Sequence, residues 1–206
     1  VMFSLDSNTN IIGCDTMWQG ILMEPGAGIE VFNGSKINDA NRAIQIDDEC
    51  ELYLTNAQFY DNIVGVYSES RNGDSYRFQA FSVTGTTFDF NGSLRPDYVG
   101  QPIHGSIPNA GINLTDVSIE GIEIGKYGAG MNSFQNMNFG VKGLRCDINI
   151  LNSQFSNIVA PDDSIYKIVG TAIYMEGDLQ QSIPSNLRVL PVGSGVNTIS
   201  NCERGV

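Results

Sequence analysis

Basic residues, histidine and long apolar runs are all scarce in this sequence, and each scarcity excludes a class of function. The 11 Lys and Arg residues stand against 23 Asp and Glu, which gives a formal net charge of −12. Nucleic-acid-binding proteins carry basic patches that contact phosphates, so we expect no nucleic-acid partner. No apolar run is long enough to cross a bilayer, and anionic lipid surfaces repel an acidic chain, so we expect no membrane insertion.

Histidine and closely paired cysteines, the usual zinc ligands, are also missing. The chain has one His and four widely separated cysteines, Cys14, Cys50, Cys146 and Cys202, with no Cys-x-x-Cys motif. No zinc site is therefore expected, and no cofactor is predicted, with calcium as the one alternative. We expect buried thiols, because cysteine is among the residue types buried most often. A disulfide in an oxidising compartment stays an alternative without assigned partners.

No segment keeps a helical period, whereas a short motif of turn and strand residues recurs six times. In each copy an apolar residue is followed two positions later by Gly, Asn or Asp and five positions later by Ile or Phe. The copies are Phe32-x-Gly34-x-x-Ile37, Leu54-x-Asn56-x-x-Phe59, Val83-x-Gly85-x-x-Phe88, Leu114-x-Asp116-x-x-Ile119, Phe134-x-Asn136-x-x-Phe139 and Ile150-x-Asn152-x-x-Phe155. A recurring unit predicts a solenoid in which each coil buries its face against the next.

The spacing of the copies and a second series of residue pairs define the expected coil. Successive copies lie 16 to 31 residues apart, which suits one coil with loops of variable length. A small residue precedes an aliphatic residue at Gly20-Ile21, Ala43-Ile44, Gly65-Val66, Gly143-Leu144, Ala172-Ile173 and Gly205-Val206. Alternation of apolar and polar residues, as in residues 52–55, indicates strands, so two short strands and two turns are expected in each coil.

These coils resemble the right-handed parallel β-helix of the pectate-lyase-like fold. The segments Met17-Trp18-Gln19-Gly20-Ile21, Gly26-Ala27-Gly28-Ile29, Ile37-Asn38-Asp39-Ala40 and Ala43-Ile44 are similar to coils of large secreted surface β-helices from bacteria of the Bacteroidetes type. The resemblance extends from about Ile11 to Phe155, and its motifs specify the fold rather than the function. It implies an exported protein, so an extracellular or cell-surface location is expected.

The expected fold is therefore an all-β, right-handed parallel β-helix that forms a single domain over residues 1–206. Neither end has the features of a solenoid cap, so we expect a segment of a longer β-helix. Three stretches leave the coil pattern and are expected to be loop insertions, near residues 91–111, 159–170 and 176–195. Equivalent residues of stacked coils lie about 4.8 Å apart, so Phe59 is expected over Phe88 and Asn136 over Asn152.

Asp47 and Asp48 form the most prominent polar cluster. Together with Glu49-Cys50 they resemble the Asp pair and Asp-Asp-Cys stretch of polygalacturonase-type glycosidases, which use two carboxylates for inverting hydrolysis. Glu49 interrupts that stretch, and the Gly-His-Gly and Arg-Ile-Lys segments of the family are missing. Adjacent strand residues also point to opposite faces. A solvated acidic turn is therefore the favoured interpretation, and no catalytic residue is predicted.

The sequence also departs from the calcium-dependent pectate lyases. Arg95-Pro96-Asp97 resembles part of their Arg-x-Pro-x-x-Arg motif, but the second Arg is absent. Asp162 and Asp163 are a minor candidate for calcium, which binds six to eight oxygen ligands. Two acidic residues in a loop are more often simply solvated, so no metal ligand is predicted.

The loop insertions are the better functional candidates, because loops on a rigid scaffold commonly carry binding residues. In the insertion at 91–111, Arg95, Asp97, Tyr98 and His104 are the predicted ligand-binding residues. The aromatic ring would stack on a sugar while the polar groups bond its hydroxyls. The alternative is a loop that only shields the flank of the solenoid.

The leading functional hypothesis is a non-catalytic extracellular β-helix that acts as a structural spacer, an adhesin or a binding surface. Its expected partner is a polysaccharide or another surface protein. The alternatives are a carbohydrate-active enzyme, either a polysaccharide lyase or a glycoside hydrolase, and a carbohydrate-binding module. A convergent set of carboxylates with a Lys or Arg on one face would favour the enzyme, and the sequence does not reveal such a set.

Overall fold

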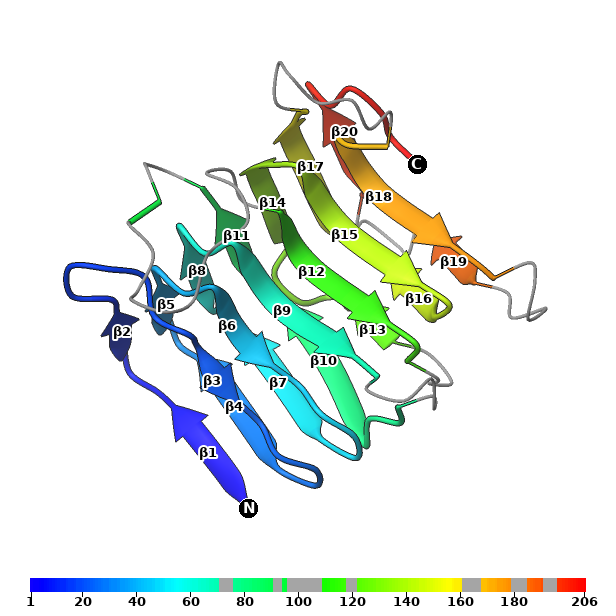
Figure 1. The fold of residues 1–206 in the computed structure, drawn as a ribbon. Coiled ribbons are helices and arrows are strands. Elements are labelled where there is room, and N and C mark those ends of the chain that lie inside the picture. Colours follow the sequence, from blue (N-terminus) through cyan, green and yellow to red (C-terminus); the bar gives the residue numbers. More distant parts are fainter. Residues whose placement is uncertain are drawn as a thin grey trace.

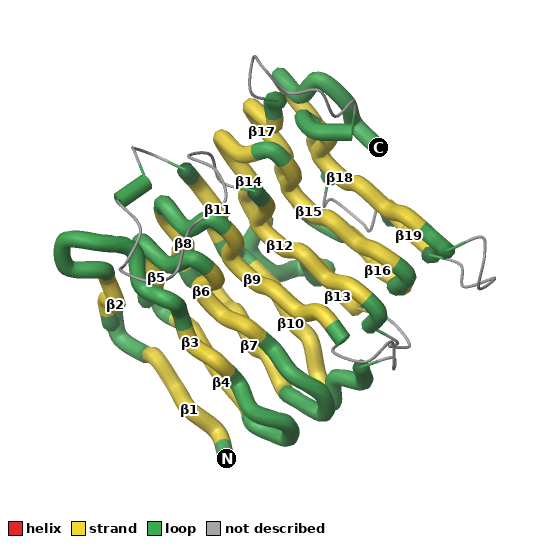
Figure 2. Tube along the Cα trace, viewed as in Figure 1, coloured by secondary structure: helices red, strands yellow, loops and turns green. Residues whose placement is uncertain are grey.

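The described part of the chain is built from short strands. The structure, a computed structural model, describes residues 1–70, 76–90, 94–95, 109–117, 122–160, 168–178, 185–190 and 196–206. Every regular element within these ranges is a β-strand (Figures 1 and 2). Over the same ranges, no helix that could span a membrane is present.

The strands form three parallel sheets, which we number in the order in which the chain visits them. Sheet 1 contains β1 (Met2–Leu5), β4 (Gly28–Phe32), β7 (Glu51–Thr55), β10 (Ala80–Thr84), β13 (Ile122–Ile124), β16 (Asp147–Ile150) and β19 (Asn186–Val189). Sheet 2 contains β2 (Asn10–Ile12), β5 (Lys36–Asn38), β8 (Gln58–Tyr60), β11 (Thr87–Asp89), β14 (Asn132–Met137), β17 (Ser153–Ile158) and β20 (Thr198–Ser200). Sheet 3 contains β3 (Ile21–Leu22), β6 (Arg42–Gln45), β9 (Val64–Glu69), β12 (Ala110–Thr115), β15 (Phe139–Leu144) and β18 (Thr171–Glu176).

The chain passes through sheets 1, 2 and 3 in turn and then repeats, so each strand pairs with the third strand before and after it. Figure 1 shows the resulting stack of coils, which rises from the N-terminal to the C-terminal end. This arrangement is a parallel β-helix, and it confirms the predicted fold class. The expectation of two strands per coil is wrong, because a complete coil has three.

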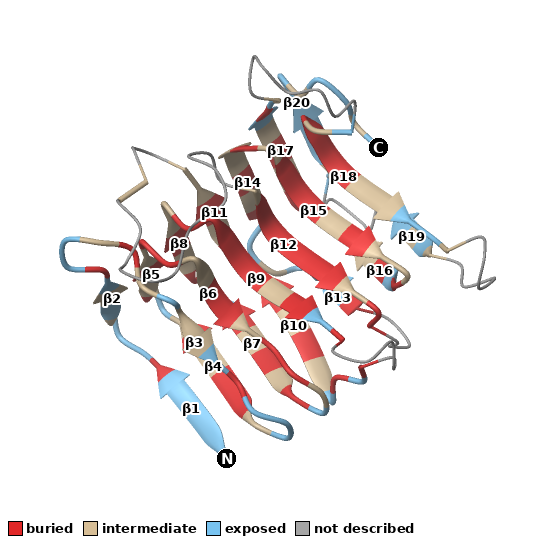
Figure 3. Ribbon diagram, viewed as in Figure 1, coloured by how far each residue is buried: buried red, intermediate tan, exposed pale blue. Residues whose placement is uncertain are grey.

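Alternation of side chains explains why these short segments become strands. In β7, Leu52 and Leu54 are fully buried, whereas Tyr53 is half-buried and Thr55 is exposed. A strand sends successive side chains to opposite faces, so each sheet has an apolar inner face and a mixed outer face. Figure 3 shows this as bands of buried and less buried residues along the central strands.

A column of phenylalanine rings fills the interior behind sheet 2. Phe59, Phe88, Phe134 and Phe155 occupy equivalent register positions in β8, β11, β14 and β17. Their ring centroids are 4.8, 5.0 and 4.9 Å apart in succession, with interplanar angles of 16°, 6° and 7°. The predicted contact of Phe59 with Phe88 is confirmed. Full burial of each ring contributes about 1.5–3 kcal/mol, and aromatic contact adds to this.

Small residues of sheet 3 make room for these rings. Gly65 and Gly111 lie between register-paired residues of β9 and β12. A Cβ atom on Gly65 would lie 2.5 Å from Cδ1 of Phe88, and one on Gly111 would lie 2.6 Å from Cδ1 of Phe134. Gly140 has the same relation to Phe155, at 2.4 Å. The small-aliphatic series and the phenylalanine column are therefore two sides of one packing arrangement.

The turn residues were identified correctly, but not every motif lies at the same corner. All six middle positions have positive φ: Gly34 (77°), Asn56 (54°), Gly85 (60°), Asp116 (55°), Asn136 (59°) and Asn152 (42°). Four lie between sheets 1 and 2, whereas Asp116 follows β12 of sheet 3 and Asn136 lies near the end of β14 of sheet 2. The same turn chemistry serves every corner, so the motif cannot distinguish them.

Because the motif occurs at different corners of the coil, two of the expected columns of stacked Phe and Asn residues are wrong. Phe139 lies in sheet 3 and is not a member of the phenylalanine column, where Phe134 stands instead. Asn136 is not stacked on Asn152: its Nδ2 donates to Asp89 at 2.6 Å, and its Oδ1 accepts from Asn157 at 3.1 Å. Ile119 lies outside the described residues.

The series of small residues that precede aliphatic residues also needs a correction. Register pairing of Val66, Ile112, Val141 and Ile173 places Gly111-Ile112 and Gly140-Val141 in this series, and it excludes Gly143-Leu144. Gly111 was missed because residues 91–111 were assigned to a loop, whereas β12 begins at Ala110. Similarly, β19 lies within the predicted insertion 176–195. The remaining loop residues fall largely outside the described part of the chain.

The four cysteines are all free thiols. Cys50 and Cys146 are buried as expected, Cys202 is half-buried and Cys14 is exposed. Burial raises the pKa of Cys146 to about 12, with a further contribution from the charge of Asp147. Cys50 and Cys146 are therefore parts of the core rather than reactive groups.

Candidate functional site

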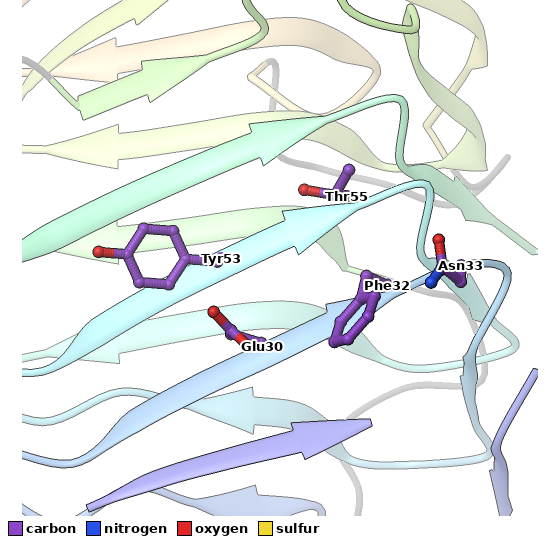
Figure 4. A pocket seen from close by; sticks show the side chains of 5 residues that line it. All are labelled: Glu30, Phe32, Asn33, Tyr53 and Thr55. Atoms are coloured by element: carbon purple, nitrogen blue, oxygen red, sulfur yellow. The ribbon is translucent and has the colours of Figure 1, made fainter. Parts of the chain in front are cut away.

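A pocket of about 250 Å³ opens on the outer face of sheet 1, where β4 and β7 lie side by side. Five residues line it: Glu30, Phe32, Asn33, Tyr53 and Thr55 (Figure 4). It combines aromatic and polar side chains on a regular part of the scaffold. The pocket is therefore the candidate functional site.

Strand alternation places these side chains on one surface. Glu30 and Phe32 project outward from β4 because Ile29 and Val31 occupy the alternate, buried positions. In β7, Tyr53 and Thr55 project outward in the same way. The register pairs Glu30 with Tyr53 and Phe32 with Thr55, so the lining residues are neighbours across two coils.

The aromatic rings and the carboxylate share the pocket. In Figure 4 Phe32 and Tyr53 stand on neighbouring strands, and the Tyr53 ring extends along β7 away from Phe32. The side chain of Glu30 lies on β4 beside Tyr53. Asn33 lies at the end of β4, beyond Phe32, and has a left-handed backbone with φ of 54°. The site thus combines two apolar ring surfaces with a carboxylate, an amide and a hydroxyl group.

Hydrogen bonds hold three of the lining side chains in place. Ser4 Oγ of β1 donates to Glu30 Oε2 at 3.2 Å. Asn33 Nδ2 donates to Asp6 Oδ1 at 2.7 Å, and Tyr53 Oη donates to Glu51 Oε2 at 3.2 Å. Each partner comes from a strand or turn next to the pocket, so the polar groups have defined positions before any ligand arrives.

The electrostatic environment of the pocket is acidic. Desolvation raises the pKa of the Tyr53 phenol, and the charges of Glu51 and Glu30 raise it further. The hydrogen bond from Asn33 lowers the pKa of Asp6. None of the five described lining residues is basic. The site therefore presents negative charge and no positive counter-charge of its own.

Arg95, the one predicted ligand-binding residue that the structure describes, does not line this pocket. Arg95 Nε forms an ion pair with Asp39 Oδ2 at 2.8 Å, and its Nη1 donates to the backbone oxygen of Cys14. Asp39 is buried, so Arg95 joins loops of the first two coils and balances a buried charge. Asp97, Tyr98 and His104 lie outside the described residues, and their role in binding stays a prediction.

The Asp47–Asp48 cluster is a structural turn between β6 and β7. Asp47 Oδ1 accepts a hydrogen bond from the backbone nitrogen of Asp48 at 2.8 Å. Asp48 Oδ1 accepts one from the backbone nitrogen of Arg77 at 2.7 Å. Glu49 takes a left-handed backbone conformation with φ of 55°. The prediction of a turn is confirmed, although Asp47 is buried rather than solvated.

Metal ligands are not grouped in the part of the chain that the structure describes. No set of three or more His, Cys, Asp or Glu side chains there has the arrangement of a cation site. Asp162 and Asp163, the minor candidate for calcium, lie outside the described residues.

Sequence reasoning missed the pocket because Phe32 was placed in the wrong column. Phe32 pairs with Thr55 of β7. The residue of β4 that aligns with Leu54 and Val83 of the next two coils is Val31. The turn after β4 contains one residue more than the turn after β7, because Phe32 pairs with Thr55 and Ile37 pairs with Phe59. Asn33 and Gly34 both have positive φ in this longer turn. The usable signal was the outward position of Tyr53 between two buried leucines, which the strand pattern already contained.

Comparisons with protein families, with curated proteins and with solved structures each find no match to this chain. The pocket and the scaffold that carries it are therefore the features that bear on function.

Proposed function

We propose that the protein is a non-catalytic β-helix that binds carbohydrate on the outer face of sheet 1. The observation that carries this proposal is the pocket in which Phe32 and Tyr53 present ring surfaces beside Glu30, Asn33 and Thr55. Aromatic rings pack against the C–H faces of sugars, while carboxylate, amide and hydroxyl groups bond sugar hydroxyls. Binding sites of this kind are concave and combine apolar walls with a few polar groups.

The scaffold supports binding because it is rigid. Glu30, Phe32, Tyr53 and Thr55 stand on two hydrogen-bonded strands whose alternate side chains are locked in the core. A site that is already ordered loses little conformational freedom when a ligand binds. A stack of coils can also hold such a site at a fixed distance from an attachment point, as a spacer or an adhesin does.

The resemblance to pectate-lyase-like surface proteins of the Bacteroidetes type supports an extracellular or cell-surface location for this activity. The alternative is a carbohydrate-active enzyme. Hydrolysis with inversion or retention uses two carboxylates on opposite sides of the scissile bond. Of the five lining residues only Glu30 is acidic, so the pocket favours binding over cleavage.

Calorimetry with neutral oligosaccharides tests the proposal. We expect Tyr53→Ala to reduce affinity about tenfold or more, since stacked aromatic anchors contribute more than 1 kcal/mol. The matched control is Tyr60→Ala, because Tyr60 is also half-buried on an outer face but belongs to β8 of sheet 2. Thermal melts of both variants check that the fold is kept.

Two results would overturn the proposal. One is equal affinity of the Tyr53→Ala and Tyr60→Ala variants for every oligosaccharide that the parent protein binds. The other is release of new reducing or unsaturated ends from the same glycans, with or without calcium, because turnover would show an enzyme.

A further inference from the structure

We propose that this pocket selects protonated amino sugars over uncharged and acidic sugars. The inference rests on the proposed carbohydrate-binding function and specifies the ligand class of the same site. It follows from the placement of one carboxylate in a pocket with two aromatic side chains, from the acidic groups around them, and from the cations that lie over comparable rings elsewhere in the protein.

The first observation is the geometry of Glu30, Phe32 and Tyr53 (Figure 4). An ammonium group is attracted to a carboxylate and also to the faces of aromatic rings, whose quadrupole is negative. Ser4 donates to one oxygen of Glu30 and thereby fixes the carboxylate on this surface. A protonated amine on a sugar ring can therefore meet the carboxylate while the sugar itself lies against a ring.

The second observation is the charge around the pocket. Glu51 accepts a hydrogen bond from the Tyr53 phenol, and Asp6 accepts one from the Asn33 side-chain amide. Both carboxylates are hydrogen-bonded to lining residues, and the whole chain has a net charge of −12. A uronate would enter this environment against like charge, whereas an ammonium group would be drawn to it.

The third observation separates this pocket from other outer-face aromatic rings. Lys36 Nζ lies 5.8 Å from the ring centre of Tyr60, and Arg42 Cζ lies 3.8 Å from that of Tyr67. Lys142 Nζ lies 5.5 Å from the ring of Phe139. Among the described residues, neither Phe32 nor Tyr53 has a Lys or Arg over its ring. At the pocket, the position that a cation takes elsewhere is open to a ligand.

Short chitosan and chitin oligomers of equal length provide the matched probes. They share one backbone and differ in whether the amine is free or acetylated, and an oligogalacturonate supplies the acidic comparison. At mildly acidic pH and low salt we expect the chitosan oligomer to bind about tenfold more tightly than the acetylated one, from one partly exposed ion pair and one cation–π contact. Added salt should reduce this difference.

Two variants assign the preference to the pocket. Glu30→Gln should bring the chitosan affinity within about twofold of the chitin affinity while chitin binding is kept. Glu123→Gln is the control, because Glu123 is an exposed carboxylate of β13 on the same sheet. Its affinity ratio should match that of the parent protein.

The possible failures are distinguishable. Equal binding of the two oligomers by the parent protein would overturn the amino-sugar inference and leave the carbohydrate-binding proposal standing. Equal loss of chitosan binding in Glu30→Gln and Glu123→Gln would show general attraction to an acidic surface, which also overturns the inference. If no oligomer binds at all, both proposals fail.

Discussion

At the scale of single residues, two phenols on the outer face of sheet 3 have equivalent surroundings. Tyr67 and Tyr174 occupy one register column in β9 and β18. Each donates a hydrogen bond to the carboxylate two residues later, Glu69 and Glu176 respectively. Desolvation by burial, followed by the hydrogen bond to Glu, raises the pKa of each phenol to about 12.

These phenols predict a specific loss of stability in alkali. The folded protein keeps both protons up to about pH 12, whereas the unfolded chain loses them near the ordinary tyrosine pKa of about 10. The stabilisation is therefore complete below pH 10 and disappears as the pH rises to 12. We expect the Tyr67→Phe, Tyr174→Phe double variant to show a smaller fall in Tm over this interval than the parent protein.

Thermal melts followed by circular dichroism at a series of pH values would measure this difference. Tyr127→Phe is the control, because Tyr127 is 61% exposed, and its profile should follow that of the parent. Cys146, whose pKa is also raised to about 12, should preserve part of the slope in the double variant. Parallel curves for all three proteins would contradict the prediction.

Turn residues show how far single positions could be predicted from the sequence. Asn56 and Gly85 were identified as turn residues, and both have positive φ, because few residue types accept that conformation. The outward position of Phe32 could not be predicted in the same way. It depends on one additional residue in the turn at Asn33-Gly34, which only the register with the next coil reveals.

At the scale of elements, the glycines of sheet 3 leave room for the rings of the phenylalanine column, because they have no side chain. Gly111 of β12 faces the ring of Phe134 at the level of the next coil. The core of each coil therefore depends on a residue from one sheet and a ring from another. Such interlocking leaves no space for an added methyl group.

Gly111→Ala should therefore lower the free energy of unfolding by about 1–3 kcal/mol, the usual cost of overpacking. The new Cβ would lie 2.6 Å from Cδ1 of Phe134 and 2.9 Å from the backbone oxygen of Gly140. The matched control is Gly205→Ala, whose Cβ would lie 3.6 Å from Ile199 in the last coil. Urea titration of both variants measures the effect, and an equal or smaller loss for Gly111→Ala would refute this packing account.

The elements themselves were partly predictable. Alternation in residues 52–55 indicated β7 because its five residues show a full in-and-out pattern. The strands of sheet 2 at Lys36–Asn38, Gln58–Tyr60 and Thr87–Asp89 have three residues each, too few to display a period. Their apolar centres were recognised as motif residues, whereas the sheet that they form was not, and so one strand per coil was missed.

At the scale of the whole molecule, the coils differ in how much they are supported. β12 lies between β9 and β15, and five of its six residues are buried. β20 pairs within the described residues only with β17, and all three of its residues are exposed. Figure 3 shows the same gradient, with exposed strands at both ends of the stack and buried strands in the middle. In a solenoid, stability is a sum of neighbouring contacts, so it should vary along the axis.

Native-state hydrogen exchange should resolve this gradient in the 206-residue chain. We expect amides of Ile112 and Leu114 in β12 to exchange only through extensive unfolding, and those of Ile199 and Ser200 in β20 to exchange through local opening. Low concentrations of urea should accelerate exchange at the central amides much more than at the terminal ones, since more surface is exposed in their opening. The same urea dependence at both places would mean that the coils open as one unit. The stack would then behave as a single cooperative core, and the nearest-neighbour description of this β-helix would be wrong.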